Sequence, residues 1–364
     1  MTSGSLAIAL PPAQIAWPEG YPPFHPRPWL VNGHLQTIFG NFLPRPSALP
    51  APVAQLVEVS PARGSQISSQ VLCECHWQPL LERPTRPTAI ILHGLEGSSR
   101  SQYVIGNANK LWRAGCNVIR MNMRNCGGRN YGDMASRSPT LYHSGLSTDV
   151  DRVLRFFIDT QGLQSVALIG YSMGGNLVLK LAGDLGASAP PQLRSVVAVS
   201  PAVDLAASAD ALHEPHNRLY ERKFVRALLK RFRHKALLFP RAFDPSRAAQ
   251  ISSLREFDDR ITALYSGFRS ADDYYFRAAA ARVLDRIAVP TLIIHASDDP
   301  FIRFTEETRA KIAANPHITL LETEHGGHCA FLASPNRASG SARGNDDDGY
   351  WAEQTTLRFV LAHA

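Results

Sequence analysis

Short apolar runs alternate with amphipathic stretches over most of the 364-residue chain. Six of the segments contain a short apolar run, which is typical of strands buried on both faces of a sheet. They lie at 88–94, 117–124, 165–172, 195–200, 290–297 and 317–324. Two earlier segments, 55–60 and 69–77, instead alternate apolar and polar residues, as half-buried strands do.

Stretches with helical spacing separate these strands, at 101–115, 147–162, 175–186 and 305–315, and a last one begins at about Trp351. Glycine or asparagine follows several of them, as expected where a helix stops. Buried strands that alternate with amphipathic helices predict an α/β fold with a mostly parallel sheet flanked by helices.

The alternation is interrupted between the strands that end near 202 and begin near 288. Residues 203–287 are helical in pattern and charged, so we expect a helical cap inserted between two strands of the core. The core then comprises residues 51–202 and 288–364. Residues 1–50 are rich in proline, which predicts an irregular arm packed on the core.

Composition narrows the class of protein. No run of eighteen apolar residues occurs, and prolines interrupt the short apolar stretch at 5–18, so neither a membrane span nor a signal peptide is expected. The five cysteines form no regular framework, which favours a reducing, cytoplasmic location.

The net charge of +7 is concentrated in one segment. Between Arg218 and Arg247, ten Lys or Arg residues face two acidic ones, a surplus of eight. Nucleic-acid modules usually add aromatic platforms or a helix-turn-helix pattern, and neither is evident, so no nucleic-acid partner is expected.

A candidate nucleophile lies between an expected strand and an expected helix. Gly170, Ser172 and Gly174 form the pattern G-x-S-x-G. A strand that turns sharply into a helix strains the backbone at the serine, and side chains two residues away on either side would clash. The turn would lift the Ser172 hydroxyl into a cleft at the helix N-terminus.

Attack on a carbonyl also requires two backbone N–H donors for the developing oxyanion. One is expected from Met173, the residue after the nucleophile, and the other from Leu95, in the loop after the strand at 88–94. His93 in the same loop is interpreted as a structural imidazole bonded to the loop backbone, because the donor needed is a main-chain group.

In this arrangement an acid and then a histidine follow the serine along the chain. The strand at 290–297 is followed by Asp298 and Asp299. A tight turn after Ala296 favours Asp299 as the acid, and Asp298 is the alternative.

The segment "TEHGGHCAF" after the last strand offers His325 and His328 as the base. His328 lies beyond two glycines that permit a turn into the cleft, so it is the predicted base, whereas His325 is interpreted as a rim or packing residue. A metal site would need a third and usually a fourth ligand, and none is expected.

Several motifs together resemble those of YheT-like α/β-hydrolases. They are "NGHLQTI" (32–38), "LHGLEGSSRSQY" (92–103), "MRNCGG" (123–128), "YHSG" (142–145), "GYSMGGN" (170–176), "FDDRITA" (257–263), "DDYY" (272–275), "DDPF" (298–301) and "GGHCAF" (326–331). The branch includes bacterial YheT-type esterases, yeast medium-chain fatty-acid ethyl ester synthases and animal ABHD-type phospholipases. The resemblance extends from about Trp29 to Phe331 and implies the catalytic set Ser172, Asp299 and His328.

The sequence departs from that branch in two places. Animal members carry an N-terminal membrane anchor, which is not expected here. The segment 334–349 before the last helix is longer and more polar than usual, so its path near His328 is open.

The expected function is hydrolysis of a small-molecule carboxylic ester, with a short- to medium-chain or lipid-like acyl group and no cofactor. An acyltransferase would use the same three residues with an alcohol in place of water, and a non-catalytic binding protein is the third and least favoured interpretation. The substrate-binding residues are not predicted.

The expected cap contains one long amphipathic helix at 219–239. Its apolar stripe comprises Val225, Leu228, Leu229, Phe232 and Ala236, and its basic residues elsewhere are Arg222, Arg226, Lys230 and Arg233. A lid that offers these cations to anionic lipid is one interpretation. A helix packed on the core with a solvated basic face is the favoured one.

Overall fold

A computed structural model describes residues 17–62, 64, 66–128, 130–334 and 348–364. Its centre is an eight-stranded sheet in the order β1-β2-β4-β3-β5-β6-β7-β8. β1 and β2 pair antiparallel at one edge, β2 joins β4 antiparallel, and the remaining neighbours are parallel. The strands are β1 Val53–Ser60, β2 Ser69–His76, β3 Thr88–Leu92, β4 Asn117–Met121, β5 Val166–Tyr171, β6 Leu193–Val199, β7 Thr291–Ala296 and β8 Ile318–Thr323.

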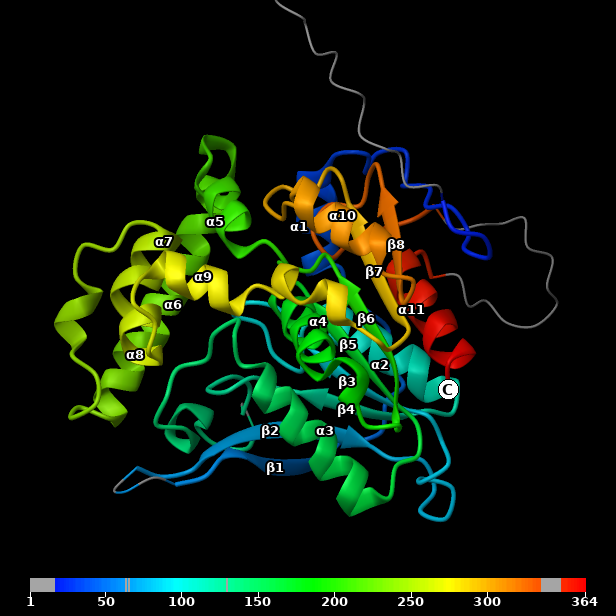
Figure 1. Ribbon diagram of the computed structural model, residues 1–364, viewed down its shortest axis with the longest axis horizontal. Helices are drawn as coiled ribbons and strands as arrows, with labels where there is room; N and C mark the ends of the chain where they lie inside the picture. Colours follow the sequence, from blue (N-terminus) through cyan, green and yellow to red (C-terminus); the bar gives the residue numbers. More distant parts are fainter. Residues whose placement is uncertain (1–16, 63, 65, 129, 335–347) are drawn as a thin grey trace, which may run out of the picture.

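Helices cover both faces of the sheet (Figure 1). The side chains of α2 (Gln102–Arg113) and α11 (Trp351–Ala362) pack with one set of strand residues. Those of α3 (Ser147–Gln161), α4 (Met173–Leu185) and α10 (Glu306–Ala314) pack with the opposite set. Successive strand residues point to opposite faces, so a doubly covered strand must be apolar throughout. The mostly parallel α/β sheet predicted from the sequence is therefore confirmed.

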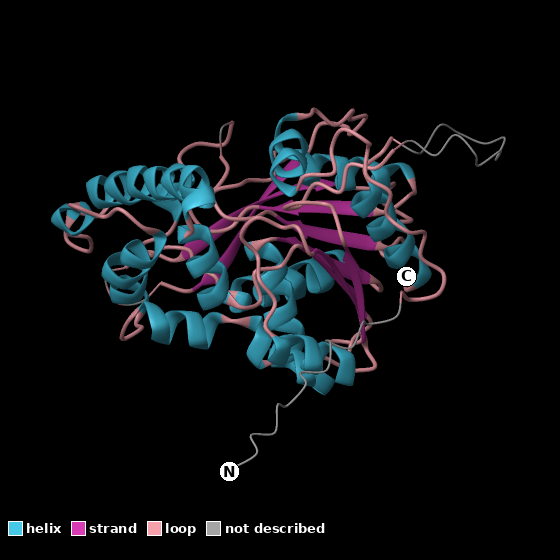
Figure 2. Cartoon of the chain, turned by 90° about the horizontal axis from the view of Figure 1, so that it is seen from above, coloured by secondary structure: helices cyan, strands magenta, loops and turns pink. Residues whose placement is uncertain are grey.

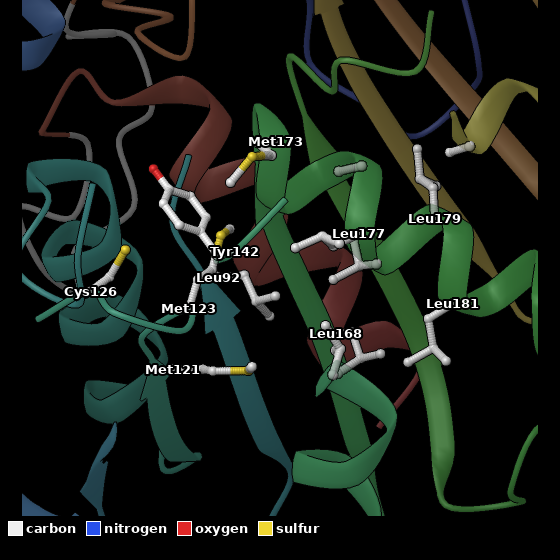
Figure 3. Packing of buried hydrophobic residues seen from close by; sticks show 14 of the residues in the cluster. Leu92, Met121, Met123, Cys126, Tyr142, Leu168, Met173, Leu177, Leu179 and Leu181 are labelled. Carbon is white, nitrogen blue, oxygen red and sulfur yellow. The ribbon is translucent and has the colours of Figure 1, made fainter. Parts of the chain in front are cut away.

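The core beneath the expected nucleophile is dense and apolar. Figure 3 shows Leu92, Met121 and Leu168 from three neighbouring strands gathered near Leu177 of α4. All four side chains are at most 2% exposed. This packing fixes where β5 ends and α4 begins, which is where Ser172 lies.

The segment between β6 and β7 is helical in the structure. It contains α5 (Leu205–His213), α6 (Arg218–Leu238), α7 (Leu254–Phe257), a π-helical turn at 258–263, α8 (Leu264–Ser266) and α9 (Ala271–Ala278). These helices gather on one side of the molecule, apart from those that cover the sheet (Figures 1 and 2).

The long helix α6 packs through its predicted apolar stripe. Val225, Leu228, Leu229, Phe232 and Ala236 are all buried, and Arg222, Arg226, Lys230 and Arg233 are exposed. The sequence did not single out Lys235, which is 1% exposed and donates to Asn125 Oδ1 (2.7 Å), to Ala135 O (2.7 Å) and to Ser138 O. Burial lowers the pKa of Lys235 to about 7. The buried amine joins α6 to the loop that follows β4.

The expectation of an irregular N-terminal arm is wrong for part of its length. Residues 33–42 form α1 (Gly33–Phe42), and Asn32 caps it by accepting hydrogen bonds from the His34 and Leu35 amides. An asparagine cap favours a helix even after a proline-rich stretch, because it satisfies N–H groups that have no partner within the helix. Before α1, Phe24 packs on Phe331 and Trp351 of the core.

Most other boundaries agree with the sequence patterns to within about two residues. The exception is the segment 117–124, whose strand ends at Met121 because Asn122–Arg124 turn away in a loop. Residues 5–16 of the apolar N-terminal stretch and nearly all of the polar segment 334–349 lie outside the described residues. Within the described ranges, no helix is long and apolar enough to cross a membrane.

Candidate active site

Ser172 occupies a strained turn between β5 and α4. Its backbone angles are φ 54° and ψ −118°, a conformation that residues with a side chain rarely adopt. A Cβ on Gly170 would lie 2.2 Å from Gly174 O, and a Cβ on Gly174 would lie 2.5 Å from His93 O. Only glycine fits at either position, which is the physical basis of the G-x-S-x-G pattern.

Two backbone amides beside Ser172 have no hydrogen-bond partner among the described residues. They belong to Leu95 and Met173, the two predicted oxyanion donors. The neighbouring amides in the first loop are occupied, since Gly94 donates to the Tyr103 hydroxyl (2.9 Å) and Glu96 donates to the Tyr142 hydroxyl (3.3 Å). The loop approaches the serine so closely that a Cβ on Gly94 would lie 3.0 Å from Ser172 Cβ.

The loop that carries Leu95 is held by an ion pair that the sequence did not reveal. Glu96, at φ 56°, accepts from Arg231 Nε of α6 (2.8 Å) and from the Tyr142 hydroxyl (2.5 Å). Arg231 also donates to Asn125 O. A carboxylate that receives charged and neutral donors at once fixes the backbone beside it. The position of Leu95 therefore depends on a helix of the segment between β6 and β7.

His93 lies under the same loop and is fully buried. Its Nδ1 is 2.8 Å from Gly94 O, and its Nε2 accepts from the Met123 amide (3.1 Å). Burial lowers the pKa of His93 to about 4. The ring is thus neutral at pH 7 and tied to backbone at both nitrogens, in agreement with its interpretation as a structural residue.

Asp299, which is buried, and His328, which is partly exposed, form a hydrogen-bonded pair. His328 Nδ1 lies 2.8 Å from Asp299 Oδ2, and Asp299 Oδ1 accepts from the amides of Phe301 (3.1 Å) and Ile302 (2.9 Å). Burial disfavours the charged carboxylate, yet His328 and the amide donors bring the pKa of Asp299 below its usual value. Burial likewise disfavours the imidazolium, but the Cys329 sulfur and the Asp299 carboxylate raise the pKa of His328 above its usual value.

Asp298 and His325, the alternatives to this pair, face elsewhere. Asp298 Oδ1 accepts from the Gly327 amide (2.8 Å), so it anchors the glycine turn before His328. His325 Nδ1 is 3.5 Å from Asp298 Oδ2, beyond good hydrogen-bond geometry, and a third of its side chain is exposed.

The missed helix α1 supports the same turn. Thr37 Oγ1 accepts from the His328 amide (2.8 Å), and Gln36 bonds both the carbonyl and the amide of Leu332. A Cβ on Gly33 would lie 2.0 Å from Asp298 O. The buried face of α1 is therefore the surface on which the His328 loop rests, and the "NGHLQTI" motif (32–38) was the signal for it.

Two cavities meet at Ser172. The first, of about 110 Å³, lies between the core and the helices after β6. The second, of about 370 Å³, is lined by α1, the Leu95 loop, the start of α6, His328 and Cys329. Leu95, Ser172, Phe224 and Phe301 border both cavities. The Ser172 hydroxyl makes no hydrogen bond to any described residue, so none of these residues blocks it from contacting a substrate.

Residues from three further motifs border the first cavity, although no role was predicted for these motifs. Its apolar lining includes Leu205, Leu212, Leu228, Leu254 and Ile302, and its polar lining comes from "YHSG", "FDDRITA" and "DDYY". Asp258 accepts there from the hydroxyls of Thr262 (2.7 Å) and Tyr275 (2.8 Å). Burial raises the pKa of Asp258 to about 6. The described residues contain no group of three or more His, Cys, Asp or Glu that could hold a metal ion.

Comparisons with known proteins agree with this architecture. A profile described as the alpha/beta hydrolase fold matches residues 87–335, more than half of the chain. The protein therefore belongs to the α/β-hydrolase family. The esterase Pf2001 of Pyrococcus furiosus shares the fold, with a TM-score of 0.52 at 14% identity over 95% of this chain and 99% of that one.

Within the family, the chain belongs to the branch that its motifs indicated. It is 34% identical over 250 residues to a protein of Escherichia coli (strain K12) named "Putative esterase YheT". The aligned region covers 68% of this chain and 71% of that protein. It is 26% identical over 339 residues to the phospholipase ABHD3 of Bos taurus. That alignment covers 92% of this chain and 75% of the relative.

Proposed function

We propose that the protein is a carboxylic ester hydrolase that works through an acyl-enzyme on Ser172. One observation carries the proposal: the cavities that meet at the strained Ser172 are also bordered by Leu95 and Met173, whose amides have no partner among the described residues, and by His328, which is bonded to Asp299. These are the parts that acyl transfer through serine requires. The names of the relatives, an esterase and a phospholipase, support an ester as the substrate.

In the proposed reaction, His328 takes the proton of the Ser172 hydroxyl through Nε2 as the oxygen attacks the ester carbonyl. Asp299 holds Nδ1–H and stabilises the imidazolium. The Leu95 and Met173 amides bind the oxyanion. The C–O bond of the ester then breaks, and the alcohol leaves with the proton from His328. Water, deprotonated by His328, attacks the acyl-enzyme, and the acid and free Ser172 are released. No step uses a cofactor.

We assign the first cavity to the acyl chain and the second to the alcohol portion of the ester. The first has a mostly apolar lining, although polar side chains such as His143 and Asp258 also border it, and helices of the segment 203–287, which would act as a cap, cover it. The second is larger and contains polar groups, among them Lys223 and Ser101.

The five cysteines are all free thiols in buried positions, which supports a reducing compartment.

This assignment is tested by filling the first cavity. Ala209 of α5 lines it and is 7% exposed, whereas Ala206 of the same helix is exposed and does not. Ala209→Leu should lower kcat/KM for p-nitrophenyl octanoate relative to the acetate by about tenfold, because added carbon atoms displace the distal part of a long acyl chain. Ala206→Leu should leave that ratio unchanged. If neither variant changed the ratio of kcat/KM for the octanoate to that for the acetate, the first cavity would not be the acyl site.

The pH dependence of kcat/KM should show the influence of Asp299. Protonated His328 cannot accept the Ser172 proton, so the rate rises with pH through the pKa of His328. Because that pKa is raised, the acidic limb should lie above the ordinary imidazole value of about 6.5. Asp299→Asn should move the limb to lower pH and reduce the plateau by about 10³–10⁴.

Asp298→Asn is the matched control for this change. The asparagine oxygen can still accept from the Gly327 amide, so the limb should stay in place and most of the activity should remain. If Asp298→Asn moved the limb and Asp299→Asn did not, the acid would be Asp298.

A further inference from the structure

The helix α1 presents its apolar side chains to solvent. Leu35, Ile38, Phe39 and Phe42 have the spacing of one helical stripe, and their exposed fractions run from 37% to 71%. Its buried face instead consists of Gly33, Gln36, Thr37 and Gly40, which hold the His328 loop. This is the reverse of a surface helix that packs on a core through its apolar stripe.

Further apolar side chains extend the stripe. Trp29 is 56% exposed and packs edge-on against Phe39 with ring centroids 5.4 Å apart, and Val31 is 48% exposed. Ile38 and Phe42 also border the second cavity, so the exposed apolar surface continues to the opening that leads to Ser172. Contiguous apolar surface of this kind marks an interaction site.

A cationic face of α6 adjoins this surface. Lys223 Nζ lies 5.8 Å from the centre of the Phe42 ring, and Arg226 and Lys230 follow Lys223 at helical spacing. All three are exposed, and within the described ranges none forms an ion pair with a carboxylate. Exposed Arg222 and Arg233 of the same helix likewise form no ion pair with a described carboxylate. The charge of this face is therefore free to act on a partner.

We propose that the apolar stripe of α1 and the basic face of α6 together dock the protein on an anionic lipid surface. The stripe would enter the boundary between headgroups and acyl chains, and the cations would bind lipid phosphates. An ester at that surface would then pass along α1 into the second cavity. The proposal rests on the proposed function, because it assigns lipid esters presented at an interface as the substrate class.

Charge favours lipid over a second copy of the chain as the occupant. In a two-fold dimer the same surface would meet itself, and the basic face of α6 would lie beside its own copy. Like charges brought together across an interface oppose association. An anionic surface neutralises them instead.

Binding is measured on the full-length Ser172→Ala chain, so that no lipid is hydrolysed. The readout is co-sedimentation with phosphatidylcholine vesicles that contain or lack phosphatidylglycerol. We expect partition onto the anionic vesicles at least tenfold above that onto neutral ones, and a decrease with added salt. Equal partition onto both, or none onto either, would overturn the proposal.

Leu35→Glu combined with Phe39→Glu tests the apolar stripe, since neither residue borders the cavities. Partition onto anionic vesicles should fall at least tenfold. The matched control is Leu80→Glu with Leu81→Glu, which adds the same charges at side chains 71% and 95% exposed in the loop before β3. That loop lies at the amino ends of the parallel strands, on the side of the sheet away from the site. Partition of this control onto anionic vesicles should therefore fall by much less than that of the α1 variant. An equal fall in both would reduce the effect to net charge and overturn the role of α1.

The basic face is tested by Arg226→Gln with Lys230→Gln, against Arg152→Gln with Arg194→Gln at exposed positions on the core. The α6 substitutions should weaken partition onto anionic vesicles several-fold more than the substitutions on the core, and equal losses would contradict a docking role for α6.

Light scattering tests whether a second copy of the chain occupies the surface instead. A wild-type dimer that becomes a monomer in the α1 variant would assign the surface to a second copy.

Activity separates this proposal from the proposed function. With Ser172 restored, the α1 variant should hydrolyse soluble p-nitrophenyl acetate at the wild-type rate, and lose activity only on an ester embedded in anionic vesicles. Wild-type protein that binds vesicles but hydrolyses no ester would contradict the proposed function and leave the docking surface standing. Hydrolysis without vesicle binding would do the reverse.

Discussion

Ser172→Ala is expected to abolish labelling by a fluorophosphonate and to lower kcat for p-nitrophenyl esters by about 10⁶, as loss of the nucleophile does in serine hydrolases. This corresponds to about 8 kcal/mol of lost transition-state stabilisation. Ser172 is held at φ 54° in the turn between Gly170 and Gly174, and alanine at this position leaves the turn without a hydroxyl. Labelling by mass spectrometry and ester turnover measure the two effects.

Ser208→Ala is the matched control for the nucleophile. Ser208 borders the first cavity as Ser172 does, but its hydroxyl accepts from the Arg303 amide (3.3 Å) and makes no hydrogen bond to a histidine among the described residues. The Ser208→Ala chain should label fully. Labelling that survived Ser172→Ala and was lost in Ser208→Ala would transfer the nucleophile to Ser208 of α5. A wild-type chain that failed to label would contradict the serine hydrolase itself.

The sheet and the strand-end residues could be predicted because local and global signals coincide there. A strand buried on both faces must be apolar throughout, and the residues that end such strands gather at one edge of a parallel sheet. Asp299 follows β7, which ends at Ala296, and His328 follows β8, which ends at Thr323. The separation of Asp299 and His328 along the chain therefore did not prevent the prediction that they lie together.

Other features depend on contacts that no local pattern encodes. The apolar stripe of α1 faces outward, so periodicity alone would have assigned it to the core. The Glu96–Arg231 pair joins residues 135 positions apart, and Lys235 was one cation among many in a basic helix. The residues that border the first cavity come from five separate segments, and only their packing shows that they surround one space.

His328→Ala should lower kcat/KM by about 10⁴–10⁶, whereas His325→Ala should retain at least a third of the activity. The two residues are three positions apart and flank the same pair of glycines, yet their surroundings differ. His328 is bonded to buried Asp299 and lies on the second cavity, and Thr37 holds its amide. His325 is a third exposed, and its approach to Asp298 at 3.5 Å is worth little in water. Turnover of p-nitrophenyl acetate by both variants measures the difference.

The asymmetry of the two histidines has a structural origin in the glycines. Gly327 adopts φ 58°, and a Cβ there would lie 2.4 Å from Gly33 O of α1. The turn can therefore press against α1 and carry the next residue into the cavity, while the preceding histidine stays at the rim. Gly327→Ala should accordingly reduce activity although it removes no reacting group. Equal losses in His325→Ala and His328→Ala would instead mean that the loop, rather than the His328 ring, limits turnover.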